Sequence, residues 1–87
     1  MPLVSKKLTV NNKQGLHARP AALFVQIANK FSARITVHSG KDAVNGKSIM
    51  GILTLGAEKG ALIVIEAEGD DAQLAIAELE KIVASQE

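Results

Sequence analysis

The spacing of the apolar residues changes along this chain between a period of two and a period of three to four, and this feature most restricts the fold. Residues 6–10 and 34–38 alternate between apolar and polar, and 62–65 is a short branched apolar run, so all three are predicted strands. Residues 21–31 and 72–83 carry apolar side chains at helical spacing. The chain is therefore predicted to mix strands with helices.

Turn and capping residues give the order of these segments. A loop at 11–15 separates the first strand from the first helix, and residues 39–40 predict a hairpin to a return strand at about 42–44. Ser48 is the expected N-cap of a short helix and Gly56 its stop. The predicted order is βαββαβα, and the short hairpin connections favour an α+β fold with the helices on one face of an antiparallel or mixed sheet.

Length and composition exclude several classes of protein. The 87 residues are expected to form one domain, 1–87, with a single modest core and no cleft between two lobes. A net charge of +1, with no basic run longer than Lys6-Lys7, argues against a nucleic-acid partner. The absence of cysteine excludes thiol chemistry, and no apolar run is long enough to insert into a membrane, so a cytoplasmic protein is predicted.

The segment Gly15–Ala22 places a histidine and an arginine at the threshold of a predicted helix. Unpaired N–H groups and the helix dipole favour an anion there. A neutral His17 imidazole could attack a phosphorus atom and hold it as a phosphoramidate, while Arg19 could pair with the phosphate oxygens. Pro20 suits the first helical turn, and Gly15 permits a tight turn before the histidine. The alternatives are a structural or idle exposed histidine and a solvated surface arginine.

The second segment of interest surrounds Ser48. A serine at this position is explained by N-capping alone, and phosphorylation is an equally weighted alternative, since a helix N-terminus tolerates a phosphate. A helix of barely two turns cannot bury all of its apolar residues on one stripe. Some of them are therefore expected to be exposed as a docking surface, with core packing as the alternative: Ile49, Met50 and Leu53, of which Met50 is the best candidate for exposure.

Other motifs carry less weight. Residues 40–48 nearly match a phosphate-binding loop, but the spacing of the glycines is wrong. RNA-binding sheets stack bases on strand aromatics, whereas Phe24 and Phe31 fall on a predicted helix. His38 is expected to be an ordinary exposed residue, and two histidines far apart predict neither a metal site nor a cofactor. The acidic residues of 66–71 are interpreted as matching the dipole of the last helix.

The two segments together resemble those of HPr, the histidine-containing phosphocarrier of the phosphoenolpyruvate:sugar phosphotransferase system. Residues 15–21 resemble its active-site signature, and residues 47–56 resemble its regulatory serine signature. The resemblance extends over essentially the whole chain, including the predicted order of elements. It implies an open-faced β-sandwich, in which a four-stranded antiparallel sheet carries three helices on one side.

The resemblance also implies roles for particular residues. His17 would be phosphorylated on its δ nitrogen by phospho-Enzyme I and would pass the group to an enzyme IIA domain, with Arg19 steadying the phosphate. Ser48 would be the target of HPr kinase/phosphorylase, and the phosphoserine form could act as corepressor for a catabolite control regulator. Ile49, Met50 and Leu53 would dock Enzyme I, enzyme IIA domains and the kinase. Such a carrier is expected to be a monomer and not an enzyme in its own right.

Three functions remain open at the level of sequence. The leading one is a phosphocarrier of the sugar system. The second is a carrier devoted to regulation, as in nitrogen-type or incomplete phosphotransferase systems. The third is a binding module that acts only as a corepressor through phosphorylated Ser48, against which the presence of His17 argues.

Overall fold

The computed structural model describes residues 2–86. Its elements are β1 (Leu3–Thr9), α1 (Ala18–Ala28), β2 (Arg34–Ser39), β3 (Asp42–Asn45), α2 (Ile49–Leu55), β4 (Leu62–Glu68) and α3 (Ala72–Ala84). The predicted order βαββαβα is confirmed. No helix within residues 2–86 has both the length and the apolar character needed to cross a membrane.

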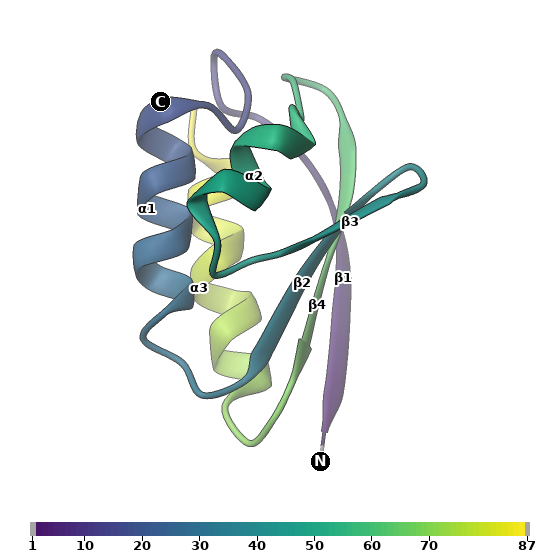
Figure 1. Cartoon of the computed structure of the whole chain (residues 1–87), viewed down its shortest axis with the longest axis vertical. Helices are drawn as coiled ribbons and strands as arrows, with labels where there is room; N and C mark the ends of the chain where they lie inside the picture. The colour runs from purple at the N-terminus through teal and green to yellow at the C-terminus, as the bar shows by residue number, and fades with distance from the viewer. Residues whose placement is uncertain (1, 87) are drawn as a thin grey trace.

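The four strands form one antiparallel sheet in the order β1-β4-β2-β3. One row across it joins Lys6, Ile65, Val37 and Val44. The helices lie together on one side of this sheet (Figure 1), and its other face carries no element of residues 2–86. The predicted α+β class, an open-faced β-sandwich with three helices on one face, is therefore confirmed.

The core lies between the sheet and the helices. The strands contribute every second side chain to the core, and the helices contribute side chains at helical spacing. Full burial of a large apolar side chain stabilises the fold by about 1.5–3 kcal/mol. The largest fully buried apolar side chains are Phe24, Leu16, Ile35, Ile52, Ile63, Ile65, Leu79, Val10, Val37 and Val83. Phe31, which was predicted on the stripe of the first helix, lies beyond the end of α1 and is only partly buried.

β1 begins three residues before its predicted start, and β4 ends three residues after its predicted end. β1 begins at Leu3 because its backbone pairs with β4 as far as Glu68, whatever the side chains at those positions. β4 continues beyond Ile65 because the alternation persists, with Ala67 buried and Glu68 exposed. The start of β1 is therefore set by backbone pairing with a strand that is distant in sequence, whereas the end of β4 follows a local alternation that the prediction stopped short of.

Asp71 lies where the dipole of the last helix favours a negative charge, and it has a second role that the sequence did not predict. Asp71 is the N-cap residue of α3, but its side chain makes no capping hydrogen bond. Its carboxylate instead accepts hydrogen bonds from the backbone N–H groups of Ser32 (2.8 Å) and Ala33 (2.9 Å). The bond from Ser32, followed by that from Ala33, holds the pKa of Asp71 below its ordinary value, against the opposing effect of desolvation.

Candidate functional site

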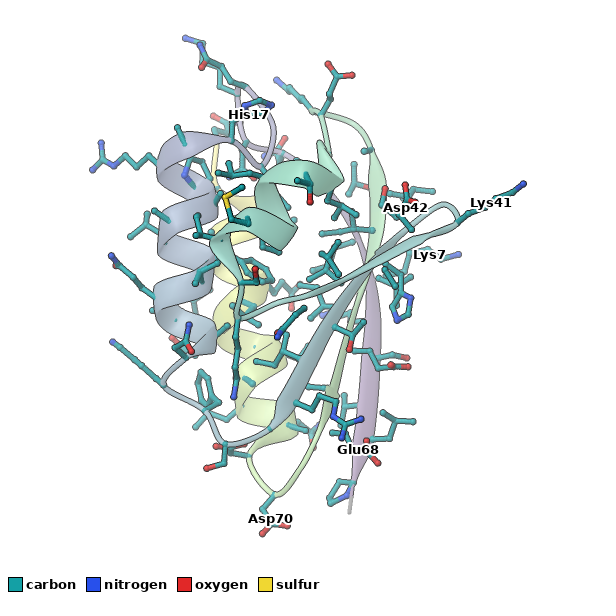
Figure 2. All side chains as sticks on the ribbon, in the orientation of Figure 1. Lys7, His17, Lys41, Asp42, Glu68 and Asp70 are labelled. Carbon is teal, nitrogen blue, oxygen red and sulfur yellow. The ribbon has the colours of Figure 1, made fainter. Side chains whose placement is uncertain are left out.

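His17 is the N-cap residue of α1, and its side chain is exposed at the end of the molecule opposite Asp70 (Figure 2). Its backbone is extended, with φ −111° and ψ 162°, and its carbonyl accepts a hydrogen bond from the N–H of Ala21 at 3.3 Å. The imidazole makes no capping hydrogen bond within residues 2–86. Because a capping histidine would use its ring in that bond, the geometry disfavours the structural alternative and leaves the ring accessible.

Ala18 gives the entry to α1 an unusual backbone geometry. Its φ of +35° lies in a range that non-glycine residues rarely adopt. Such a conformation costs of order 1–3 kcal/mol and persists where the surrounding chain enforces it. Leu16, two residues earlier, is fully buried, and Ala21 begins the buried stripe of α1. The chain is thus fixed on both sides of the turn at which His17 sits.

A cavity of about 230 Å³ lies beside His17. Its lining residues are Lys13, Gln14, Gly15, His17, Ala18, Arg19 and Pro20. Two of these carry a positive charge and none carries a carboxylate. Within residues 2–86, neither Lys13 nor Arg19 makes an ion pair. Together with the N-terminal dipole of α1, these cations make the cavity suited to an anion.

The loop that carries His17 is held by close backbone packing. Gly15 has φ +80°, as the prediction of a tight turn requires, and its N–H donates to the carbonyl of Asn12 at 3.0 Å. The N–H of Leu16 donates to the carbonyl of Ala57 at 2.8 Å. A Cβ on Gly15 would lie 2.5 Å from that carbonyl oxygen, so only glycine fits here. The approach of residues 57–58 to this loop was not predicted from the sequence.

The same loop is attached to the C-terminal end of α3. Asn11 donates from its backbone N–H to Val83 O (3.0 Å) and from Nδ2 to Ala84 O (2.9 Å). Asn12, which is 1% exposed, donates from Nδ2 to Ile82 O (2.8 Å) and Ser85 O (3.0 Å). Both asparagines fall in the predicted loop at 11–15, and their attachment to α3 was not predicted. Their adjacency after a strand is the only local signal, and it does not identify the partner.

Ser48 lies at the start of α2, as predicted. Its Oγ accepts a hydrogen bond from the N–H of Gly51 at 3.0 Å, and the side chain is half-buried. Gly56 ends the helix in the left-handed conformation, also as predicted. A Cβ on Gly51 would lie 3.2 Å from Asn45 O, so this glycine permits close packing of α2 on β3. The cap explains Ser48 structurally and leaves its phosphorylation untested.

The apolar side chains of α2 divide as the sequence predicts. Ile52 is fully buried, whereas Met50 is 65% exposed and Ile49 and Leu53 are 38% and 37% exposed. α2 packs against α1 on the helical side of the sheet (Figure 1). We name Ile49, Met50 and Leu53 the α2 apolar surface. Its exposure makes it available to a partner on the same side of the sheet as α1.

His38 lies outside this site. It is on the open face of the sheet, where its Nε2 is 3.5 Å from Oε1 of Glu66, and both side chains are 39% exposed. Residues 2–86 contain no cluster of three or more His, Cys, Asp or Glu side chains that could hold a metal ion. The candidate site is therefore the cavity beside His17, with Ser48 and the α2 apolar surface as separate features.

Comparison with known proteins identifies the family. The fold and the histidine at the start of α1 define a small α+β protein with an accessible imidazole in a cationic cavity. A sequence model of the family described as "PTS HPr component phosphorylation site" matches residues 4–85. The chain belongs to the HPr family.

Individual relatives agree with this assignment. The HPr-like protein Crh of Halalkalibacterium halodurans is 46% identical over 74 residues, which are 85% of this chain and 88% of that protein. The phosphocarrier protein HPr of Bacillus anthracis superposes with a TM-score of 0.90 at 48% identity, covering 93% of this chain and 96% of that one. The structure of an HPr dimer from Thermoanaerobacter tengcongensis superposes with a TM-score of 0.74 at 51% identity, covering 87% of this chain and 87% of that one.

Proposed function

We propose that this chain is a phosphocarrier that accepts a phosphoryl group from phospho-Enzyme I on His17 and passes it to enzyme IIA domains of sugar permeases. The observation that carries the proposal is the exposed imidazole beside a cavity lined by Lys13 and Arg19 and by no carboxylate. Membership of the HPr family supports it. The protein would act in the cytoplasm as an intermediate in phosphoryl transfer and would not turn over substrate as an enzyme.

The chemistry requires little of the carrier. A nitrogen lone pair of the neutral His17 imidazole forms a P–N bond while the P–N bond to the donor histidine breaks. The donor ring, protonated on its other nitrogen, leaves as a neutral imidazole, and His17 keeps the N–H proton it already carries, so no water is consumed. Catalysis of such transfers is mostly positioning and relief of phosphoryl charge. Arg19, Lys13 and the N-terminus of α1 place positive charge where the three phosphoryl oxygens would lie.

A transfer assay tests this proposal. The purified chain is incubated with phosphoenolpyruvate and Enzyme I from a related bacterium, and its intact mass is recorded before and after mild acid. We expect one acid-labile phosphoryl group on the wild type and none on His17→Ala. Absence of labelling on the wild type, with an Enzyme I shown active on another carrier, would reject the carrier function.

We further propose that Ser48 is phosphorylated by HPr kinase/phosphorylase with ATP. Ser48 is half-buried at the N-terminus of α2, beside the exposed Ile49 and Met50, so a dianion there would alter the α2 apolar surface directly. Mass spectrometry after incubation with the kinase should show an acid-stable phosphate on the wild type and none on Ser48→Ala. An acid-stable phosphate that persists on Ser48→Ala would assign the modification elsewhere.

A second candidate function follows from the similarity to Crh, an HPr-like protein. In this alternative the chain serves regulation, either as a carrier of a nitrogen-type or incomplete phosphotransferase system or as a corepressor for a catabolite control regulator through phosphorylated Ser48. Pull-down of that regulator by the phosphoserine form alone, combined with no transfer from His17 to any enzyme IIA domain, would favour it. Sugar phosphorylation in a reconstituted permease assay would favour the transport carrier.

We propose that the working unit is a monomer. β1 is an edge strand of the sheet and carries Lys6 and Lys7 near its centre, and charged side chains on an edge oppose pairing with a second copy. The HPr dimer from Thermoanaerobacter tengcongensis makes the question open to experiment. Sedimentation velocity over a range of concentrations should give the monomer mass throughout, and a stable dimer species would contradict the proposal.

A further inference from the structure

Each of the two functional segments is joined to the C-terminal carbonyls of a helix by one asparagine side chain. The loop that precedes His17 is joined to α3 through Asn12, and the loop that precedes Ser48 is joined to α1 through Asn29. A carbonyl oxygen has two lone pairs, so Ile82 O and Val25 O, which accept the backbone N–H groups of Ser85 (3.3 Å) and Asn29 (3.0 Å), can each accept a second donor. A primary amide supplies two N–H donors from a single nitrogen, which lets Asn12 bind two carbonyls at the end of α3 and lets Asn29 bind one carbonyl of α1 and one carbonyl of the loop before Ser48.

Asn12 connects the loop of His17 to the end of α3. Its buried Nδ2 donates to Ile82 O (2.8 Å) and Ser85 O (3.0 Å), 70 and 73 positions along the chain. Its own carbonyl accepts the N–H of Gly15 at 3.0 Å, which closes the turn before the histidine. A displacement of Asn12 therefore reaches His17 through Gly15 and the buried Leu16.

Asn29 connects the loop of Ser48 to the end of α1. It is the C-cap residue of α1, and its Nδ2 donates to Val25 O (2.9 Å) and to Lys47 O (3.2 Å). Lys47 is held further, because its Nζ donates to Phe31 O at 2.6 Å. Lys47 is the residue directly before Ser48, so the carbonyl that Asn29 binds belongs to the peptide group that leads into the N-cap.

We infer that Asn12 and Asn29 are positioning residues, Asn12 for the phosphoryl-accepting His17 and Asn29 for the phosphorylation of Ser48. The inference rests on the proposed function of these two residues. Each asparagine bridges a helix end to one functional loop through its side-chain amide. The bonds of Asn12 and those of Asn29 involve different loops and different helices, so the two effects are separable.

At the buried Asn12 we expect the amide group, and not merely side-chain volume, to be required. A carboxylate in place of the Asn12 amide would face the carbonyl oxygens of Ile82 and Ser85 and would be repelled by them. A misplacement of about 1 Å at a reacting group can cost on the order of a hundredfold in rate. Loss of the asparagine hydrogen bonds should therefore slow the reaction at the nearby His17 or Ser48 by more than the fall in the folded fraction accounts for.

The experiment compares Asn12→Ala with Asn29→Ala in the full chain, each serving as the control for the other, since within residues 2–86 each loses two side-chain hydrogen bonds to carbonyl oxygens. Two rates are measured at equal folded concentration: phosphoryl transfer from phospho-Enzyme I to His17, and phosphorylation of Ser48 by HPr kinase. We expect Asn12→Ala to slow the first by about tenfold or more and to change the second by less than about twofold, with the reverse for Asn29→Ala. Asn12→Asp, which keeps the shape, should be at least as slow as Asn12→Ala.

A readout that needs no partner protein accompanies these rates. Amide hydrogen exchange of the unphosphorylated variants should accelerate at Gly15 and Leu16 for Asn12→Ala, and at Gly51 and Ile52 for Asn29→Ala. Equal slowing of both reactions by both variants, or rates unchanged in both, overturns the inference, as does a fully active Asn12→Asp. If the wild type gains no phosphoryl group, the proposed function is rejected. The hydrogen-exchange rates of the two variants then show separately whether Asn12 and Asn29 hold their loops in place.

Discussion

The backbone N–H of Leu16 donates to the carbonyl oxygen of Ala57 over 2.8 Å and joins the residue before His17 to the segment that follows α2. Leu16 is fully buried and Ala57 is 3% exposed, so this bond is shielded from water. α2 begins at the cap formed by Ser48 and leads to Ala57. The loop of the candidate phosphoryl acceptor thus rests on the segment that follows the candidate regulatory helix.

Replacement of Gly15 by alanine should destabilise the protein strongly. Gly15 combines φ +80° with a position where a Cβ would lie 2.5 Å from Ala57 O and 2.9 Å from the Cα of Glu58. Both obstacles are backbone and cannot rotate away. We expect the free energy of unfolding, measured by urea denaturation, to fall by about 3 kcal/mol.

Gly60→Ala is the matched control for this prediction. Gly60 has φ +90°, and nothing would lie within 4 Å of a Cβ added there, so alanine meets the conformational penalty without the clash. We expect a loss of about 1–2 kcal/mol. Equal losses at the two glycines would show that the packing of Gly15 on Ala57 contributes nothing beyond backbone conformation.

Ser48→Ala should lower stability modestly, whether or not Ser48 is a regulatory site. The change removes the Oγ acceptor from the N–H of Gly51 and leaves the start of α2 without its cap. The expected loss is about 1 kcal/mol in the free energy of unfolding. Ser48→Asp retains an acceptor and adds a negative charge at the helix N-terminus, so it should recover most of this loss. An Asp variant as unstable as the Ala variant would mean that the cap is not what stabilises α2.

The local parts of the structure could be predicted from the sequence because their causes are local. Alternation or a branched apolar run identified β1, β2 and β4, helical spacing identified α1 and α3, and turn or capping residues identified β3 and α2. Ser48 and Gly56 marked both ends of α2 because capping depends on adjacent backbone groups. The length of α2 predicted that some of its apolar residues would be exposed, and the adaptable side chain of methionine favoured Met50, which is 65% exposed. The segment Gly15–Ala22 predicted an anion-favouring start of α1 at His17 and Arg19, but the cavity beside it and the contribution of Lys13 to its lining were not predicted.

Contacts between distant segments could not be predicted in this way. The buried amide of Asn12 finds its acceptor 70 positions away, and the carboxylate of Asp71 finds its donors 38 and 39 positions away. An asparagine in a loop and an aspartate before a helix are both common for local reasons. These local reasons gave no indication that either side chain bonds a distant segment. Both residues bond backbone groups, which every residue possesses and no sequence pattern marks.

Asp71→Asn should reduce stability in a pH-dependent manner. Hydrogen bonds from Ser32 and then Ala33 lower the pKa of Asp71 in the folded protein below its value of about 3.9 in the unfolded chain. A carboxyl group whose pKa is lower in the folded state than in the unfolded state stabilises the fold fully at pH values above its unfolded pKa. This contribution is lost as the pH falls through its folded pKa. The difference in unfolding free energy between wild type and Asp71→Asn should therefore be largest near pH 7 and shrink below about pH 4.

Asp70→Asn serves as the control for this measurement. Asp70 is the neighbouring carboxylate, it is exposed, and it makes no hydrogen bond to the segment of Ser32 within residues 2–86. Urea denaturation of both variants at several pH values separates the specific effect from general acid destabilisation. A difference for Asp71→Asn that stays constant across this pH range would contradict the pH dependence.

Met50→Asp should weaken docking to Enzyme I without unfolding the protein. Met50 is 65% exposed, so the change buries no new charge in the free chain, whereas a partner that covers the α2 apolar surface would have to desolvate the carboxylate. We expect the dissociation constant, measured by calorimetry, to rise by about tenfold or more. Leu74→Asp, at a leucine of α3 that is 60% exposed, introduces the same charge outside that surface and should leave binding within about twofold of wild type. If the two variants weaken binding equally, net charge and not the α2 apolar surface determines the affinity, and the assignment of Ile49, Met50 and Leu53 to docking fails.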